Sequence, residues 1–515
     1  MRQTRRGVRV IPMAAAVIAL TMSAACLDMD IVNLNEPDAI RALGNPDDVQ
    51  SLLAASYTRW WRGAQRRDAA MTLVAYGEEL ISGHGNWQWG TAQNFPRRSW
   101  PNTPGDPTVM DDLWEEMYGA ISQANDPLMV MDQGMDFGPG GRDNLRARAF
   151  GRFIQGISHG MLALAFDRAY VVDEAVNPAR DPIELLPYDR VMEAAIAYLE
   201  DAIELSLSGS FTLPADWING LEVSNQELAR LAHSYIARFL PSVARTPEER
   251  AAVDWAAVVH HADQGIVQDF APLGSGSSRF FCGLKFYGGD PRWMRVSYMV
   301  IGPADTTGAF QAWYEGPPED RVEFDMSGPD IRIHAPGDPE APGTDFYYDG
   351  PSSHSPTQRP YRWGRYMPHR YSHHEGRAGP MPVFLVSELD FLKAEAFLRL
   401  GNPQAAADLI NITRVGRGGL PPVGVDDPYI MEKLVYEKRI ELAVSAAGIS
   451  YFDARGWGFL HERSPLHFPI PALQLELIEE PIYTFGGNHP DGAPPRSLHP
   501  VALTEEDLDI IRSRP

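Results

Sequence analysis

The chain contains little cysteine and little positive charge. Only two of its 515 residues are cysteines, Cys26 and Cys282, which excludes the multi-disulfide framework of small exported domains. Its 45 lysine and arginine residues face 68 aspartate and glutamate residues, a formal net charge of −23. A surface this acidic repels phosphate backbones and anionic lipid, so nucleic-acid binding and non-specific membrane adhesion are not expected.

The sequence also lacks the short motifs of common enzymes. It has no His-Glu-x-x-His, no Gly-x-Ser-x-Gly, no P-loop and no dinucleotide-binding fingerprint. Two histidine clusters, His260-His261 in a helix and His373-His374-Glu375 in a loop, could each bind metal. Both are interpreted as surface residues, because adjacent side chains on a helix diverge and an isolated pair is more often at the surface. Cys282 stands among apolar neighbours and is interpreted as a buried structural residue. We therefore predict no catalytic residue, no metal and no cofactor.

The apolar stretch near the N-terminus is too short to cross a bilayer with ease. It runs from Val10 to Met22, about 13 residues against the ~20 of a transmembrane helix. Arginines precede it and Ser23-Ala24-Ala25-Cys26 follows, the order of a secretory signal that ends in a lipobox. We expect residues 1–25 to be a signal peptide, Cys26 to carry acyl chains such as palmitate, and residues 26–45 to form a tether. Ordinary secretion is the alternative, because Ser23 stands where a lipobox usually has leucine.

The remaining chain shows mainly helical periodicity. Apolar residues recur every three or four positions from residue 46 to about 268, and we expect residues 46–270 to form an N-terminal helical scaffold. Successive helices of this kind usually form antiparallel hairpins, although no strict 34-residue repeat is visible. The expected helices start at 46 and cover about 107–133, 143–169, 188–206, 224–240 and 254–268.

Helical periodicity is lost between residues 271 and 380, a segment crowded with glycine, proline and aromatic residues. Long irregular segments are either functional or disordered, and the aromatic density argues against disorder. We therefore expect an irregular ligand-binding lobe with a few short strands, such as 320–326 and 361–367.

Helical signals return in the last third of the chain. We expect residues 381–480 to form C-terminal helical hairpins and residues 481–515 to form a surface tail. Ser387, with Asp390 three residues later, predicts a helix start, and Gly401 suits the left-handed residue that ends that helix. The other helices expected here cover 405–415, 427–447 and 503–512.

Three sequence blocks resemble the SusD/RagB family. They are Trp114-x3-Tyr118-x2-Ile121-x2-Ala124-Asn125, the segment from Glu388 to Leu420, and the segment from Arg439 to Gly458. Each block is weak alone, but they occur in the family's order and span nearly the whole chain. The chain departs from the family at Ala447-Gly448, where a Glu-Gly pair is usual, and at Arg455-Gly456-Trp457, where Arg-Trp is usual.

The resemblance implies both an architecture and a function. The fold would be mainly α, a tetratricopeptide-like scaffold of helical hairpins with a long irregular lobe and a few short strands. The protein would be a surface-exposed, lipid-anchored outer-membrane protein that binds oligosaccharide or polysaccharide. It would deliver this glycan to a SusC-like TonB-dependent barrel. A peptide ligand is the alternative within the family.

Several residues in these blocks are interpreted as structural. Arg439, Glu441, Asp453 and Arg455 are expected to form buried or half-buried ion pairs. Asn125 lies on an apolar helix face and is expected to hydrogen-bond to backbone. Trp114, Trp255 and Trp457 lie in helical or scaffold segments and are expected to be core residues.

Two aromatic clusters are the candidate ligand sites, because aromatic rings stack on the apolar faces of sugars while polar groups bind the hydroxyls. In the family the site falls in loops equivalent to these two regions, so the resemblance places it by region only. For each ring the plain alternative is a core position. The candidate residues are Asn86, Trp87, Trp89 and Trp100 in the first cluster and Tyr347, Tyr348, Tyr361 and Trp363 in the second.

Two other functions remain open. A glycoside hydrolase needs two facing carboxylates, and acidic residues are abundant, but no local pattern marks such a pair. A helical-repeat lipoprotein that only holds a barrel complex together is the second alternative. Turnover of a polysaccharide would favour the hydrolase, and a barrel partner without a ligand would favour the scaffold.

Overall fold

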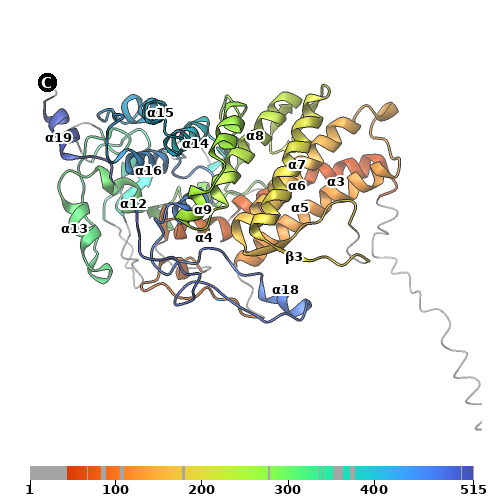
Figure 1. The fold of residues 1–515 in the computed structure, drawn as a ribbon, viewed down its shortest axis with the longest axis horizontal. Coiled ribbons are helices and arrows are strands. Elements are labelled where there is room, and N and C mark those ends of the chain that lie inside the picture. Colours follow the sequence, from red (N-terminus) through yellow and green to blue (C-terminus); the bar gives the residue numbers. More distant parts are fainter. Residues whose placement is uncertain are drawn as a thin grey trace, which may run out of the picture. The chain divides into compact units, whose positions relative to one another are not determined.

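In the computed structural model, long helices pack side by side from the start of the described chain (Figure 1). The structure describes residues 43–66, 68–82, 88–104, 109–176, 180–276, 279–335, 337–338, 340–351, 364–371, 377–499 and 501–513. The predicted signal peptide, most of the tether and Cys26 lie outside these residues. Within the described ranges no helix is both long and apolar enough to cross a membrane.

The N-terminal scaffold is a series of antiparallel hairpins, as the periodicity predicts. Each helix packs on its neighbour in the chain (Figure 1). Ser224 starts one of them with a complete capping box, in which Glu227 is the reciprocal partner. The five long helices are α3 (Pro46–Gln65), α5 (Val109–Asp132), α6 (Asn144–Ala165), α7 (Tyr188–Leu207) and α8 (Asn225–Ser242).

The core residues expected on these helices are confirmed. Trp114 and Trp255 are buried, and Trp457 is buried beside the C-terminal helices. Asn125 donates to the Val172 carbonyl at 3.3 Å and accepts a hydrogen bond from Gln155 at 2.8 Å, so its polar group is satisfied inside the scaffold.

The C-terminal helices continue the scaffold. α10 (Trp255–Asp263) packs against both α8 and α14 (Val386–Arg399), and α14 forms a hairpin with α15 (Pro403–Gly416). Gly401 in the turn has φ +79°, the left-handed conformation expected there. Ser387, however, does not cap α14. The Asp269 carboxylate accepts from the Val386 backbone N–H at 2.9 Å and takes that role.

The long helix expected over 427–447 is shorter in the structure. α16 (Ile430–Glu441) ends six residues early, and a turn with Val444 at φ +54° precedes α17 (Ile449–Gly456). Glu79 accepts from the Val444 N–H at 2.6 Å and the Tyr371 hydroxyl donates to the Val444 carbonyl. These contacts from distant segments satisfy backbone groups that would otherwise continue the helix, so tertiary structure overrides local propensity.

The lobe between residues 271 and 380 holds only short elements, as expected. β7 (Met294–Val296) pairs antiparallel with β1 (Leu80–Ser82), and β8 (Phe346–Tyr348) pairs with β9 (Tyr366–Pro368). The strand expected at 320–326 is wrong, because the structure has irregular chain there. The lobe helices are α11 (Gly283–Tyr287), α12 (Tyr298–Ile301) and α13 (Ala309–Glu315).

Smaller elements cover the edges of the scaffold. The hairpin of β4 (Thr212–Ile218) and β5 (Leu221–Ser224) follows α7 and was not among the elements expected from the sequence. α19 (Glu505–Arg512) confirms the expected C-terminal helix. The others are α4 (Asp68–Tyr76), α9 (Pro247–Ala251), α18 (Ala472–Leu477), β2 (Arg168–Tyr170), β3 (Leu185–Pro187), β6 (Leu273–Gly274) and β10 (Gly379–Pro380).

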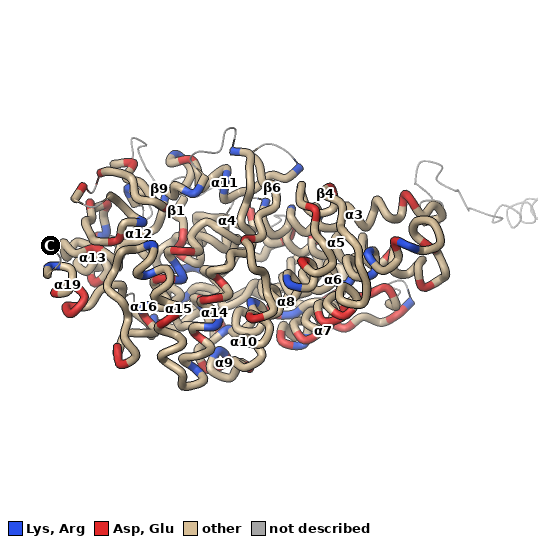
Figure 2. The backbone as a smooth tube through the Cα atoms, turned by 90° about the horizontal axis from the view of Figure 1, so that it is seen from above, with Lys and Arg blue, Asp and Glu red and all other residues tan. Residues whose placement is uncertain are grey.

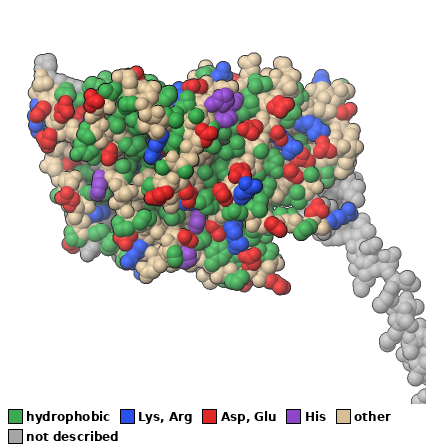
Figure 3. Space-filling model, viewed as in Figure 1, with side chains coloured by type: hydrophobic (Ala, Val, Ile, Leu, Met, Phe, Trp, Pro, Cys, Tyr) green, Lys and Arg blue, Asp and Glu red, His purple; other side chains and the backbone are tan. Residues whose placement is uncertain are grey.

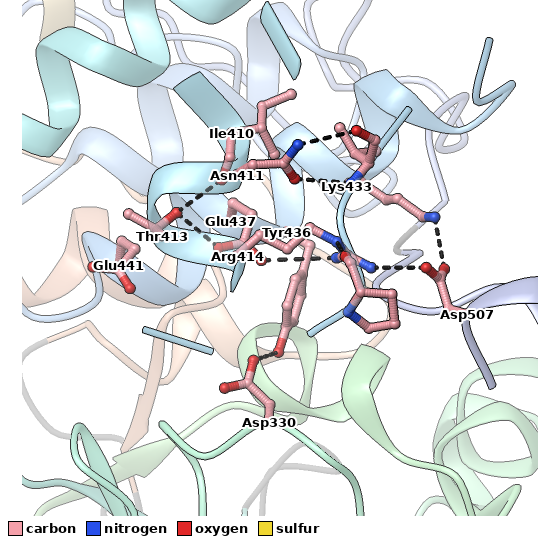
Figure 4. A network of polar contacts seen from close by, with 12 residues as sticks. Asp330, Ile410, Asn411, Thr413, Arg414, Lys433, Tyr436, Glu437, Glu441 and Asp507 are labelled. Carbon is pink, nitrogen blue, oxygen red and sulfur yellow. Dashed lines mark hydrogen bonds and ion pairs between the residues drawn. The ribbon is translucent and has the colours of Figure 1, made fainter. Parts of the chain in front are cut away.

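Buried charges join the lobe to the C-terminal helices. The Arg332 guanidinium contacts Asp330 at 2.7 Å, Glu437 at 2.7 Å and Glu441 at 2.9 Å, all in the interior. Figure 4 shows the same network from the side of Arg414 and Asp507, with Tyr436 donating to Asp330 at 2.6 Å. Because each charge has an opposite partner, the lobe is fixed to α16 at several points.

The expected ion pairs are confirmed for two of four residues. Glu441 pairs with Arg332, and Asp453 pairs with Lys438 at 2.7 Å. Arg439 and Arg455 differ from the expectation, because the described residues give their guanidinium groups backbone carbonyls as partners instead of carboxylates. They therefore fix loops by hydrogen bonding.

The surface carries mixed charge. Acidic side chains are scattered over the face shown in Figure 3, and acidic residues are frequent along the backbone of α7 in Figure 2. Residues 46–515 form one compact unit, so the finer domain boundaries expected at 270, 380 and 480 stay predictions.

Candidate ligand-binding surface

Three half-buried aromatic rings lie on and beside α11, and a fourth lies on β8. Three of them surround Tyr287, whose buried ring lies 4.8 Å from Phe286, 5.5 Å from Trp293 and 6.2 Å from Phe281. Edge-to-face contacts of this kind hold the rings in place. Tyr347 of β8 supplies the fourth ring, edge-on to His369 at 5.9 Å. We call Phe281, Phe286, Trp293 and Tyr347 the aromatic surface.

Charged groups are fixed beside these rings. The Asp290 carboxylate is buried and accepts from Arg292 at 2.7 Å and from Arg377 at 2.9 Å. The Arg377 guanidinium lies 4.8 Å from the centre of the Phe286 ring and donates to the Phe286 carbonyl at 2.7 Å. One carboxylate therefore orients two guanidinium groups, and one of these covers a ring of the aromatic surface.

Neighbouring charges keep Asp290 ionised and Tyr347 neutral. Burial alone would raise the pKa of Asp290, but hydrogen bonds from Arg292 and then from Arg377 outweigh it and hold the pKa well below its usual range. Burial and the nearby Asp349 carboxylate raise the pKa of the Tyr347 hydroxyl, with Asp290 adding to the rise. The hydroxyl of Tyr347 therefore stays a neutral donor and acceptor at physiological pH.

This arrangement supplies ring faces for stacking and charged groups for hydrogen bonding. In the described part of the chain, no three His, Cys, Asp or Glu side chains are grouped so that they could hold a metal ion. The buried Cys282 thiol nearby has its pKa raised to about 11 by burial, which leaves it a poor nucleophile. The geometry suits non-covalent capture of a ligand with apolar faces and polar edges.

Solved structures show what scaffold carries this surface. A SusD-like protein from Bacteroides fragilis matches with a TM-score of 0.56 and 15% identity, over 81% of this chain and 87% of that chain. A SusD superfamily protein from B. fragilis matches with a TM-score of 0.55 and 13% identity, over 85% and 99%. The chain has the SusD fold. The sequence itself matches no protein-family model and no curated protein.

A third match bears on ligands. It is a SusD-like carbohydrate binding protein from B. fragilis, with a TM-score of 0.54 and 14% identity over 81% of this chain and 87% of that chain. Identity this low fixes the SusD fold and leaves the ligand open. The mainly helical architecture inferred from the three sequence blocks is thereby confirmed.

Two of the predicted site residues are core residues in this SusD-like chain. Trp89 is 0% exposed and lies edge-on to Tyr287 at 5.0 Å, and Trp100 is 2% exposed and lies 4.8 Å from Phe468. The C-terminal chain lies against Trp100, whose backbone N–H donates to the Phe485 carbonyl at 2.8 Å, whereas Trp89 packs against the Tyr287 ring of the lobe. Neither ring offers a face to a ligand, so both are corrected to structural positions.

The two neighbouring tyrosines of β8 lie on opposite sides of the strand, as side chains alternate in a strand. Tyr347 lies edge-on to His369 and close enough to Asp290 for that carboxylate to raise its pKa. Tyr348 lies edge-on to Tyr366 at 5.5 Å and donates to Asp325 at 2.9 Å. Only Tyr347 therefore joins the aromatic surface, and Tyr348 belongs to a separate polar cluster.

Four predicted residues, Asn86, Trp87, Tyr361 and Trp363, lie outside the described residues, and their role stays a prediction. The described residues that flank them lie near the aromatic surface. Ser82 pairs with Met294, next to Trp293, and the Gly350 and Gly364 carbonyls both accept from Arg295.

The sequence did not predict Phe281, Phe286, Trp293 or the charged group around Asp290 as site residues. The segment Asp290-Pro291-Arg292-Trp293 carries a signal, because a polar turn that presents a tryptophan beside an arginine is unusual in a core. Arg377 lies 84 or more residues from these partners in the chain, and no local pattern could have connected it to them.

Proposed function

We propose that this SusD-like protein captures a glycan at the aromatic surface and delivers it to a TonB-dependent outer-membrane barrel. The observation that carries the proposal is the pairing of half-buried rings with charged groups held by Asp290. Rings bind the C–H faces of sugars, and the guanidinium groups of Arg292 and Arg377 donate to hydroxyls at the edges.

The affinity for a single sugar unit is modest in this proposal. The surface offers a few rings, and their stacking must offset the freedom that the ligand loses on binding. Several repeating units engaged at once would raise the apparent affinity. A peptide is the alternative ligand, since the same guanidinium groups bind carboxylates.

The anchor and the barrel partner are part of the same proposal. They are supported by the signal-like segment 1–25 with Cys26 at its end and by the SusD fold. Several acyl chains on Cys26 would hold an acidic protein at a membrane that its own charge does not favour.

A titration series tests the function. The full chain, purified in detergent, is titrated by calorimetry with a panel of neutral polysaccharides and peptides, and the products are analysed. Saturable binding of a glycan without new products supports the proposal, and product formation would replace it by the hydrolase. Binding of peptides alone would assign the alternative ligand class.

A further inference from the structure

A cavity of about 550 Å³ lies between α3, α5 and the β4–β5 hairpin. It adjoins the aromatic surface through the segment 279–281, because Arg279 lines the cavity and the Phe281 carbonyl accepts from Trp61 of α3 at 3.0 Å. Figure 2 shows α11, β6 and β4 in succession along this edge of the molecule. The volume is within the range of pockets that bind small ligands.

The lining of this cavity is positive, in contrast to the acidic chain around it. It contains three arginines, Arg59, Arg62 and Arg279, and one acidic residue, Asp216. Arg59 pairs with Glu116 at 2.9 Å. For Arg62 and Arg279 the described residues provide no ion pair, so two guanidinium groups remain for a ligand.

Two amide atoms at the cavity also lack partners. The Gln50 Nε2 and Gln123 Oε1 atoms are buried, and among the described residues neither has a hydrogen-bond partner. A buried amide atom without a partner is unfavourable, and a ligand hydroxyl would supply the missing hydrogen bond. One atom donates and the other accepts, which matches a hydroxyl group that does both.

The walls of the cavity are held in place. Trp217 is buried, and its ring centre lies 5.0 Å from that of Phe150. The Arg146 guanidinium lies 5.2 Å from the centre of the Trp217 ring. On the opposite wall Gly119 leaves room for Arg59, since a Cβ at Gly119 would lie 2.1 Å from Arg59 Nε. The cavity is therefore shaped by the core and does not depend on a single surface side chain.

We propose that this cavity binds a uronic acid residue of a saccharide, with its carboxylate on Arg62 and Arg279. Guanidinium groups bind carboxylates through two parallel hydrogen bonds, and the Gln50 and Gln123 amides bind the sugar hydroxyls. The saccharide class rests on the proposed function, and the acidic specificity rests on this cavity alone.

The test compares an acid with its neutral ester. The full chain in detergent is titrated by calorimetry with a galacturonate tetramer, with the methyl ester of this tetramer and with inorganic sulfate. We expect the acid to bind at least about tenfold more tightly than the ester, because charged hydrogen bonds from guanidinium to carboxylate are stronger than those to a neutral ester. Sulfate alone is expected to bind far more weakly.

The double variant Arg62→Gln, Arg279→Gln is expected to lose this preference and to bind acid and ester alike. Arg142→Gln is the matched control, since the Arg142 side chain is 71% exposed and lies outside the cavity lining. Thermal melts of both variants check the fold. An unchanged preference in the double variant overturns the proposal, as does equal binding of acid and ester or no binding of the acid.

Two results separate this proposal from the proposed function. If Trp293→Ala abolishes binding of neutral glycans and the arginine variant leaves that binding unchanged, the aromatic surface binds neutral glycans independently of the cavity. If the arginine variant abolishes acid binding while Trp293→Ala changes no affinity, the cavity stands and the aromatic surface fails. Displacement of the acid by sulfate at equal concentration would overturn the uronic acid assignment, because the cavity would then recognise charge alone.

Discussion

The role of each aromatic residue depends on what covers it. Trp89 and Trp293 both contact the Tyr287 ring, yet Trp89 is fully buried and Trp293 is half-buried. In the sequence both stand among glycine and polar residues, and only the arginine beside Trp293 is a local sign of the difference. Trp89 packs against Tyr287, which lies far along the chain in the lobe, so the sequence could indicate candidate regions but could not choose among their rings.

The two tryptophans give opposite predictions. Trp293→Ala should weaken glycan binding roughly tenfold and leave the fold intact, because it removes a stacking face at the surface. Trp89→Ala should lower the free energy of unfolding by about 3–5 kcal/mol, because it leaves a cavity in the core. Calorimetric titration and chemical denaturation measure these effects. Unchanged glycan affinity in a folded Trp293→Ala protein would remove that ring from the site.

A charge at the same surface gives a second prediction. Asp290→Asn should weaken glycan binding, because the neutral amide no longer orients Arg292 and Arg377 through charged hydrogen bonds. Asp349→Asn is a suitable comparison, since Asp349 pairs with Arg295 instead. If the two variants bind glycan equally well, the guanidinium groups held by Asp290 do not take part.

At the scale of helices and strands, local signals predicted most helix starts and tertiary contacts decided the exceptions. Pro46, Asn402 and Ser224 all begin helices as their residue types suggest. α16 ends before the predicted residue because Glu79 and Tyr371 hydrogen-bond to the backbone at Val444. The short strands of the lobe pair with distant partners, and a single-sequence pattern cannot reveal such pairing.

Buried ion pairs between helices give a third prediction. Arg250 of α9 contacts Glu395 of α14 at 2.7 Å and Asp453 of α17 at 3.1 Å. Glu395→Gln should lower the free energy of unfolding by about 3–5 kcal/mol, because Arg250 would lose a buried partner. Glu200→Gln on the exposed face of α7 is the control and should have little effect. Equal stability of the two variants would contradict this account.

The same pair predicts how stability depends on acid. Burial raises the pKa of Glu395, but Arg250 outweighs it and lowers the pKa from 4.5 to about 2. A lowered folded-state pKa means that the contribution is fully present above pH 4.5 and is lost as pH falls towards 2. Denaturation of wild-type protein and Glu395→Gln at several pH values measures this. The difference between them should shrink over that interval, and a constant difference would contradict the assignment.

At the scale of the whole molecule, the acidic net charge and the signal-like segment both bear on how the protein could be held at a membrane. A protein with net charge −23 has no electrostatic attraction to anionic lipid, so a stable membrane location needs a covalent anchor. The resemblance of three sequence blocks predicted the SusD fold of most of the chain, because scaffold residues carry those blocks. The candidate ligand-binding residues lie outside these three blocks, so the blocks could not identify them.

The anchor gives the prediction at this scale. Cys26→Ala should release the protein from the membrane fraction of cells, because no cysteine would be left to carry acyl chains there. Cell fractionation followed by immunodetection measures the distribution. Retention of the Cys26→Ala protein in membranes would contradict lipid anchoring, and loss of the wild-type protein to the medium would indicate ordinary secretion.

The most direct test of the central claim is calorimetric titration of wild type and of the Trp293→Ala, Tyr347→Ala double variant against the same glycan panel, with product analysis. Tyr429→Ala is the matched control, since Tyr429 is 44% exposed and distant in sequence from the surface. The account predicts saturable binding without cleavage in wild type and control, and loss of binding in a folded double variant. Cleavage of the glycan, or wild-type affinity in the double variant, would contradict it.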